Sequence, residues 1–157
     1  MISTLSFRIK NWEIRLEAGK NGLKRVVLGK HRTFCRSRQT GTPVKFLERA
    51  EKQLKEYFLG KRRKFSCRLD LTETTLFRRR VFFETMRIPY GRFRTYGQIA
   101  RKINKSGAGR AVGQALAANP FPVLVPCHRV LGANGRLTGF SAGLKKKKML
   151  LELEKCS

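Results

Sequence analysis

The sequence predicts an α+β fold in two domains, residues 1–71 and residues 72–157. Three short segments that alternate apolar and polar residues, followed by one helical segment, fill the first domain. Helical periodicity interrupted by Pro and Gly fills the second domain. With 157 residues and 41% hydrophobic composition, the chain is long enough to bury a proper core. We therefore expect a small antiparallel sheet with a helix, followed by a mostly helical domain.

The first domain begins with three predicted strands. They are residues 2–9, 12–16 and 23–28. Asn/Gly turns separate these segments, as is typical of hairpins. A helix is predicted to start at Pro43, because proline suits the first helical turn, and to end at Gly60. A short extended segment at residues 65–71 leads out of the domain.

The second domain begins with a predicted helix at about residues 75–88, which Pro89 ends. Thr95 and Gln98 then have the spacing of a capping box, so a short helix should begin there. A Gly/Ser-rich turn at residues 104–109 and a helix at about residues 108–118 follow. Two short helices joined by a Gly-containing turn are typical of a helix-turn-helix. A Gly-rich loop at residues 132–143 and a terminal helix at about residues 144–155 complete the prediction.

The charge of the chain indicates a nucleic-acid partner. It carries 36 Lys+Arg against 10 Asp+Glu, a formal net charge of +26, and each predicted domain contributes +13. A field of this size attracts nucleic acid through counterion release. The sequence has no strongly amphipathic basic helix flanked by Trp, so a membrane surface is the less favoured partner. The few acidic residues argue against a two-carboxylate glycosidase or a multi-carboxylate magnesium nuclease.

The cysteines and apolar runs indicate an intracellular protein. The four cysteines lie far apart without Cys-x-x-Cys spacing, which argues against a disulfide framework and for a reducing compartment. No apolar run reaches the 18 residues or so that a membrane span requires, and the amino terminus does not have the pattern of a signal peptide. We expect cytoplasmic localisation and no membrane association.

Cys127 and His128 are the first candidates for chemistry. A thiolate is a strong nucleophile, and a neighbouring base makes it accessible near neutral pH. Pro122 and Pro126 oppose helix, so the segment should be extended or turned. Adjacent side chains of a strand point to opposite faces, so Cys127 and His128 would need a turn or a bridging water to interact.

Other interpretations of this pair stay open on local sequence alone. For an isolated Cys-His pair, a buried structural cysteine beside a hydrogen-bonded histidine is the favoured interpretation. His31 and Cys35 have the spacing of two metal ligands on a helix, but no second pair accompanies them. A cysteine hydrolase would need a distant histidine, and only His31 could serve.

The order of several motifs decides between these interpretations. They are Ile88-Pro89-Tyr90-Gly91, Thr95-Tyr96-Gly97-Gln98-Ile99-Ala100, Arg110-Ala111-Val112-Gly113, Ala118-Asn119-Pro120 and Val125-Pro126-Cys127-His128-Arg129-Val130. In this order and spacing the chain closely resembles the O6-alkylguanine-DNA alkyltransferases, also called methylated-DNA–protein-cysteine methyltransferases. The resemblance is strongest from about Leu76 to Glu154, and it implies that the amino-terminal domain is ribonuclease H-like.

The resemblance implies a role for each catalytic candidate. Cys127 is the alkyl acceptor, which reacts once and irreversibly, and His128 is the base that takes the thiol proton through a water. Glu154 is expected to orient His128, although Glu152 lies close enough in the helix to be confused with it. Asn119 is expected to hold the turn that carries the cysteine. The family uses no cofactor for this reaction, and we find no zinc ligand set in the sequence.

The resemblance also implies a DNA-binding surface and a base pocket. The partner is double-stranded DNA that contains O6-alkylguanine, bound by a monomer after the base is flipped out. The implied DNA contacts are Tyr96, Arg110, Ala111, Gly113 and Ala117, with Arg110 filling the gap that the base leaves. The implied pocket residues are Val130, Phe140 and Ser141. Several relatives have Tyr at the position of Phe140. The alternative is a non-enzymatic alkyltransferase-like protein, but such proteins replace the acceptor cysteine.

Overall fold

The computed structural model describes residues 1–30 and 40–155. The chain divides into two compact units, Met1–Glu73 and Thr74–Ser157. The amino-terminal unit has a three-stranded antiparallel sheet and one helix, and the carboxy-terminal unit is mostly helical. The predicted α+β class is confirmed.

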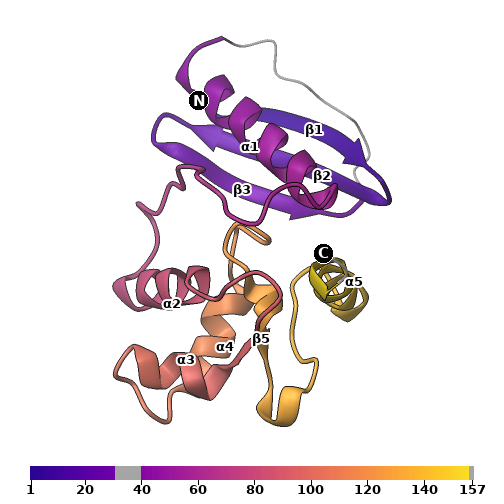
Figure 1. The fold of residues 1–157 in the computed structure, drawn as a ribbon. Coiled ribbons are helices and arrows are strands. Elements are labelled where there is room, and N and C mark those ends of the chain that lie inside the picture. The colour runs from indigo at the N-terminus through magenta and orange to yellow at the C-terminus, as the bar shows by residue number, and fades with distance from the viewer. Residues whose placement is uncertain (31–39, 156–157) are drawn as a thin grey trace. The chain divides into compact units, whose positions relative to one another are not determined.

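The amino-terminal sheet has the strand order β1-β2-β3. Its strands are β1 (Ser3–Ile9), β2 (Trp12–Gly19) and β3 (Gly22–Leu28). Alternate residues point to one face, where Leu5 pairs with Leu16 and Phe7 with Ile14. Helix α1 (Thr42–Phe58) lies across this face (Figure 1) and buries its own apolar side chains against it. The sheet and α1 therefore form one hydrophobic core.

The extended segment predicted at residues 65–71 pairs with the start of β3. The Leu23 N–H donates to the Arg68 carbonyl at 2.9 Å, and the Asp70 N–H donates to the Leu23 carbonyl at 2.7 Å. Gly22 has φ +143°, and a Cβ at this position would lie 2.6 Å from the Arg68 carbonyl oxygen. Only glycine fits this close approach without a shift of the backbone.

Three helices of the carboxy-terminal unit pack together: α2 (Leu76–Met86), α3 (Tyr96–Lys102) and α4 (Gly109–Ala117). The predicted capping box forms at the start of α3. The Gln98 N–H donates to Thr95 Oγ1 at 3.2 Å, and the Thr95 N–H donates to Gln98 Oε1 at 2.8 Å. Helices α3 and α4 occupy the predicted helix-turn-helix segments.

The rest of this unit is built around the cysteine segment. Two-residue strands β4 (Arg94–Thr95) and β5 (Val130–Leu131) pair in parallel. Strands this short show no alternating pattern, so the sequence did not predict them. Single helical turns occur at η1 (Cys127–Arg129) and η2 (Ala133–Gly135). Helix α5 (Leu144–Lys155) packs against η1. Within the described ranges 1–30 and 40–155, no helix is long and apolar enough to cross a membrane.

Candidate active site

A tight turn presents Cys127. The backbone reverses at Val123, where the Val125 N–H donates to the Phe121 carbonyl at 2.8 Å. Val123 is a buried β-branched residue with φ +74°, a strained conformation that the surrounding core must hold. The Arg129 N–H then donates to the Pro126 carbonyl at 2.9 Å and closes η1. The prolines of this segment predicted an extended or a turned conformation, and Cys127 and His128 lie on a turn.

Asn119 ties this turn to the end of α4. Its Nδ2 donates to the Val125 carbonyl at 3.1 Å, and its Oδ1 accepts the Phe121 N–H at 2.9 Å. One buried side chain thereby satisfies two backbone groups that have no place in a helix or sheet. The geometry is that of a residue that fixes the loop before Cys127.

His128 is completely buried and is bound to Glu154. Its Nε2 lies 2.7 Å from Glu154 Oε1, and its Nδ1 has no hydrogen-bond partner among the residues that the structure describes. A carboxylate accepts only, so the hydrogen-bond network assigns the imidazole proton to Nε2. The lone pair on Nδ1 is then available to accept a proton. Burial lowers the pKa of His128 and keeps the imidazole neutral, despite the opposing effect of Glu154.

Glu154 is held by an arginine that sequence reasoning assigned no role. Arg129 Nε donates to both carboxylate oxygens, at 3.1 and 3.0 Å, and its Nη2 donates to Oε1 at 2.9 Å. Arg129 Nη1 also donates to the Ile88 carbonyl at 2.7 Å, and the guanidinium lies 5.7 Å from the centre of the Tyr90 ring. The carboxylate is therefore oriented from several sides.

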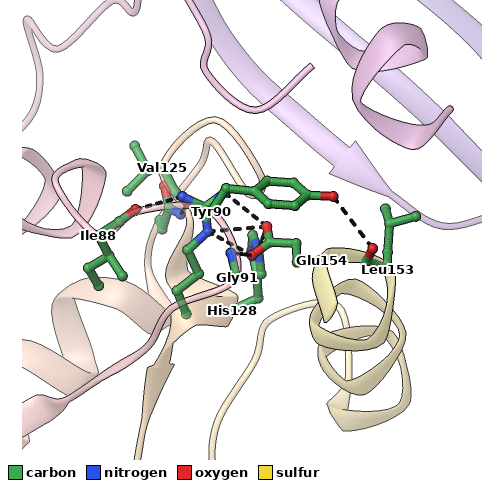
Figure 2. Close-up of polar contacts among 9 residues, drawn as sticks. Ile88, Tyr90, Gly91, Val125, His128, Leu153 and Glu154 are labelled. Atoms are coloured by element: carbon green, nitrogen blue, oxygen red, sulfur yellow. Dashed lines mark hydrogen bonds and ion pairs between the residues drawn. The ribbon is translucent and has the colours of Figure 1, made fainter. Parts of the chain in front are cut away.

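The segment Tyr90-Gly91 closes this cluster. The Gly91 N–H donates to Glu154 Oε2 at 3.1 Å, and the Tyr90 hydroxyl reaches the Leu153 carbonyl at 3.5 Å. Figure 2 shows that His128 and Gly91 both contact the carboxylate of Glu154, and that the Tyr90 ring extends toward α5. Burial by itself raises the pKa of Glu154, but the hydrogen bonds from His128 and Arg129 outweigh it and hold the pKa at about 2. Glu154 is ionised at neutral pH.

The structure separates Glu154 from its neighbour Glu152. Glu154 is 2% exposed and contacts His128, whereas the Glu152 side chain is 60% exposed and lies 3.9 Å from Lys148. The histidine partner is thus Glu154. Glu152 lies on the solvent side of the same helix and offers an internal control.

Lys147 is a second buried cation that sequence reasoning missed. Its Nζ donates to the carbonyls of Val130 and Thr138, at 2.7 Å each, and to that of Gly139 at 3.3 Å. These bonds tie the Gly-rich loop to the strand that follows the Cys127 turn. Burial lowers the pKa of Lys147 to about 8. Its position in α5, seven residues before Glu154, places both on one helix face, and this periodicity is the signal that could have revealed it.

The thiol of Cys127 is protonated at rest. Burial raises the pKa of Cys127 to about 11, although the Asn119 amide and the Lys147 charge lower it in part. The side chain is 5% exposed. A reaction at this sulfur therefore requires that the proton leave during the reaction, and His128 is the neutral base beside it in the chain.

A groove of about 500 Å³ lies along the exposed side of α4. Its lining includes four of the predicted DNA contacts, Tyr96, Arg110, Gly113 and Ala117, together with Thr138 and Gly139 of the Gly-rich loop. The Tyr96 hydroxyl donates to the Thr138 carbonyl at 3.0 Å, so this ring joins the groove to the loop that Lys147 holds. Arg110 is exposed near the start of α4. The fifth predicted contact, Ala111, is half-buried and does not line this groove.

The predicted pocket residues occupy different environments. Val130 is completely buried in β5, and its carbonyl binds Lys147. Phe140 is half-buried, its carbonyl accepts the Gly143 N–H at 2.9 Å, and Ser141 is exposed. The last two lie in the Gly-rich loop near Gly139, which borders the groove.

Within residues 1–30 and 40–155, no three His, Cys, Asp or Glu side chains are grouped as metal ligands. His31 and Cys35, the pair with metal-ligand spacing, lie outside the described residues. The same holds for His31 as the distant histidine of a cysteine hydrolase.

Comparison with known proteins decides the family. The family described as "6-O-methylguanine DNA methyltransferase, DNA binding domain" matches residues 76–156. A methylated-DNA–protein-cysteine methyltransferase of Methanosarcina mazei is 40% identical over 144 residues, which are 91% of this chain and 90% of that protein. The chain belongs to this methyltransferase family.

Relatives in mycobacteria have the same name and a known structure. The methyltransferase of Mycobacterium tuberculosis is 50% identical over 103 residues, which cover 66% of this chain and 62% of that protein. The crystal structure of the M. tuberculosis O6-methylguanine methyltransferase has a TM-score of 0.80 at 36% identity and covers 99% of this chain and 94% of that one. A structure of the M. tuberculosis protein in complex with DNA has the same TM-score at 38% identity, covering 98% of this chain and 92% of that one. The methyltransferase fold thus extends through both units.

Proposed function

We propose that this methyltransferase-family protein repairs DNA by moving an alkyl group from O6 of guanine to the sulfur of Cys127. The observation that carries the proposal is the buried network of His128, Arg129 and Glu154, which begins at the residue after Cys127. Family membership supports the same reaction. The alkyl acceptor is a residue of the protein itself, so each molecule consumes its acceptor and reacts once.

The proton and electron movements follow from the site. As Cys127 Sγ bonds to the alkyl carbon, the bond between this carbon and O6 breaks and its electrons move onto guanine. The thiol proton passes to His128 Nδ1, through a water in our proposal, and the imidazolium is stabilised by ionised Glu154. The released guanine takes up one proton, which balances the one that the thiol gave up. The resulting thioether is stable, so the protein is not regenerated.

The groove on α4 supplies the DNA contact in this proposal. A base inside a duplex cannot reach the sulfur of Cys127, a residue that is only 5% exposed, so the base must be flipped out. Arg110 and the small residues Gly113 and Ala117 line the groove, where close approach to the minor groove is possible. Arg110 is proposed to fill the space left by the flipped base, and Tyr96 to contact the flipped nucleotide. We propose that Ala111 lets α4 approach the duplex, and that Phe140, Ser141 and Val130 shape the base pocket.

Cytoplasmic localisation and a monomeric state are part of this proposal. The substrate would be cellular DNA, and the acceptor works only as a reduced thiol. The amino-terminal unit is proposed to act as a scaffold.

The test is to map the adduct. After incubation with a duplex that contains one O6-methylguanine, mass spectrometry should find one methyl group on Cys127. Cys127→Ser should form no adduct yet bind the duplex as well as the wild type, because the thiol makes no phosphate contact. A methyl group on Cys67 would contradict the proposal. Tight binding to the lesion without any adduct would instead identify a non-enzymatic binder.

A further inference from the structure

A second cleft of the carboxy-terminal unit lies between α2 and the end of α3. Its volume is about 470 Å³. Its charged and aromatic lining consists of Arg80, Phe83, Glu84, Arg87, Lys102 and Lys105. None of these residues lines the groove on α4 or belongs to the network around Cys127. The cleft is therefore separate from the residues to which the proposed repair reaction is assigned.

Cations dominate this cleft. Four positive side chains and one carboxylate line it, and Glu84 Oε2 lies 3.4 Å from Arg87 Nη1, which offsets the charge of Glu84. In the part of the chain that the structure describes, Arg80, Lys102 and Lys105 have no acidic partner. Like charges around one cleft repel each other, and an anion bound between them would relieve this repulsion. The lining thus favours a ligand with more than one negative charge.

An exposed aromatic ring lies among these cations. Phe83 is 55% exposed, although a Phe ring gains the most free energy when it is buried. It is on the same face of α2 as Arg80 and Arg87, because the spacings of three and four residues repeat along one side of a helix. Cationic side chains that hold phosphates, with aromatic rings on which bases stack, are the combination that binds unpaired nucleic-acid strands. A duplex presents phosphates but no free base face, so it would leave the ring unused.

We propose that the α2–α3 cleft binds a segment of single-stranded nucleic acid. Its phosphates would lie against Arg80, Arg87, Lys102 and Lys105, and one base would stack on Phe83. This site goes beyond the proposed repair reaction and does not depend on it. It would let the protein hold an unpaired strand while the groove on α4 stays free.

The stacking step is tested with Phe83→Ala and an oligothymidine of about 12 nucleotides, a length within the site sizes of single-strand-binding domains. Fluorescence anisotropy should show a loss of affinity of roughly 5- to 150-fold, because one stacked base is worth about 1–3 kcal/mol. Phe83→Trp should retain the affinity. The matched control is Phe93→Ala, since Phe93 is 57% exposed and lies outside the cleft. An equal loss for the Phe93 variant, or no loss for the Phe83 variant, would overturn the proposal.

The phosphate contacts are tested by salt dependence. Arg80→Ser combined with Lys105→Ser should reduce the slope of log affinity against log salt by about 1.4, which is about 0.7 for each phosphate contact on a single strand. Arg25→Ser combined with Lys45→Ser removes the same charge from exposed positions of the other unit and should leave the slope nearly unchanged. If both pairs changed the slope equally, binding would depend on net charge rather than on the cleft.

Parallel measurements separate base stacking on Phe83 from binding by charge alone. Binding to a duplex of equal length should not respond to Phe83→Ala, and an equal loss on duplex and single strand would contradict stacking. Binding of polyglutamate that depends on Arg80 and Lys105, with unchanged binding of oligothymidine, would overturn the proposal in favour of an acidic protein partner. Alkylation of Cys127 by a free alkylated base should be the same in Phe83→Ala as in the wild type. Failure of the wild type in that assay would count against the proposed repair and not against this site.

Discussion

The buried cluster around Glu154 and the open groove on α4 differ in their exposure to water, although both belong to the carboxy-terminal unit. In the cluster, His128, Arg129 and Glu154 are almost fully removed from water, and several hydrogen bonds fix the carboxylate. In the groove, Arg110 is exposed and its neighbours Gly113 and Ala117 are small. A substitution in the cluster should be costly, because each buried charge is stabilised by its partner. The exposed charge of Arg110 in the groove is stabilised by water and needs no such partner.

This difference separates chemistry from recognition. Breaking a buried ion pair leaves a charge without a partner in a medium of low dielectric constant, which is costly. Removing an exposed charge costs little, because water replaces the contact. We therefore expect substitutions in the cluster to change both stability and reactivity, and substitutions in the groove to change only the response to DNA.

The largest effect is expected for Glu154→Gln. Arg129 would keep its charge in the buried cluster while its carboxylate partner is lost, so the free energy of unfolding should fall by about 3–5 kcal/mol. Urea denaturation measures this change. Glu152→Gln makes the same chemical change at an exposed site of the same helix and should cost less than about 1 kcal/mol. Similar losses in the two variants would show that the cluster is no more sensitive than the surface.

Acid should remove the contribution of Glu154 in the wild type. Its pKa is about 2 in the folded protein against an ordinary 4.5, so it contributes stability above the ordinary value and loses it as the pH falls toward 2. The difference in stability between wild type and Glu154→Gln should therefore shrink between about pH 4.5 and pH 2. Denaturation curves over this range measure it. A constant difference would mean that Glu154 has an ordinary pKa in the folded state.

A smaller effect is expected for Lys147→Met. The buried carbonyl of Val130 would lose its donor, at a cost of about 1–3 kcal/mol. At pH 7, below its pKa of about 8, Lys147 is charged and favours the Cys127 thiolate, so its loss should slow the reaction of Cys127 with iodoacetamide at this pH. The difference from the wild type should disappear as the pH rises above about 8, where Lys147 becomes neutral. Lys148→Met, at an exposed position of α5, is the control, and an equal slowing in both variants would argue against a specific effect of Lys147.

Local sequence signals predicted the elements of the fold well. The Thr95–Gln98 capping box forms as expected, and the terminal helix runs from Leu144 to Lys155, where helical spacing predicted it. The β4–β5 pair was missed, because two residues are too few to show a period. The turn at Val123 was missed as well, because positive φ is rare at a β-branched residue and only its packing enforces it.

The site was predicted less completely, for a physical reason. The motifs and the family resemblance pointed to Cys127, His128 and Glu154. In a chain with 36 Lys+Arg, however, no local feature marks Arg129 as a cation that becomes buried, and the helical spacing that places Lys147 on the face of Glu154 does not by itself distinguish it from the other lysines of α5. Their burial depends on how α5 packs against the Cys127 turn, which is a tertiary contact. Conversely, the sequence alone predicted Arg110 at the start of a helix, because that position needs only local structure.

The smallest effect on stability is expected for Arg110→Ala. Arg110 is exposed, so the free energy of unfolding should change by less than about 0.5 kcal/mol. Transfer from duplex DNA should nevertheless fall by about 10- to 100-fold, because flipping a base costs a few kcal/mol and the side chain is proposed to offset part of this cost. Single-turnover rates with duplex DNA and with a free alkylated base measure the two effects separately. The free base needs no flipping, so its rate should be unchanged.

Arg101→Ala is the matched control for that comparison, since Arg101 is exposed on α3 and does not line the groove on α4. It removes the same charge from the same helix pair, so any loss that it shares with Arg110→Ala reflects the long-range field of the protein. A loss confined to Arg110→Ala and to duplex DNA would place the recognition step in the groove, apart from the chemistry of the cluster. Equal losses on duplex and free base would mean that Arg110 acts on the reactive cysteine, and the separation between the two regions would fail.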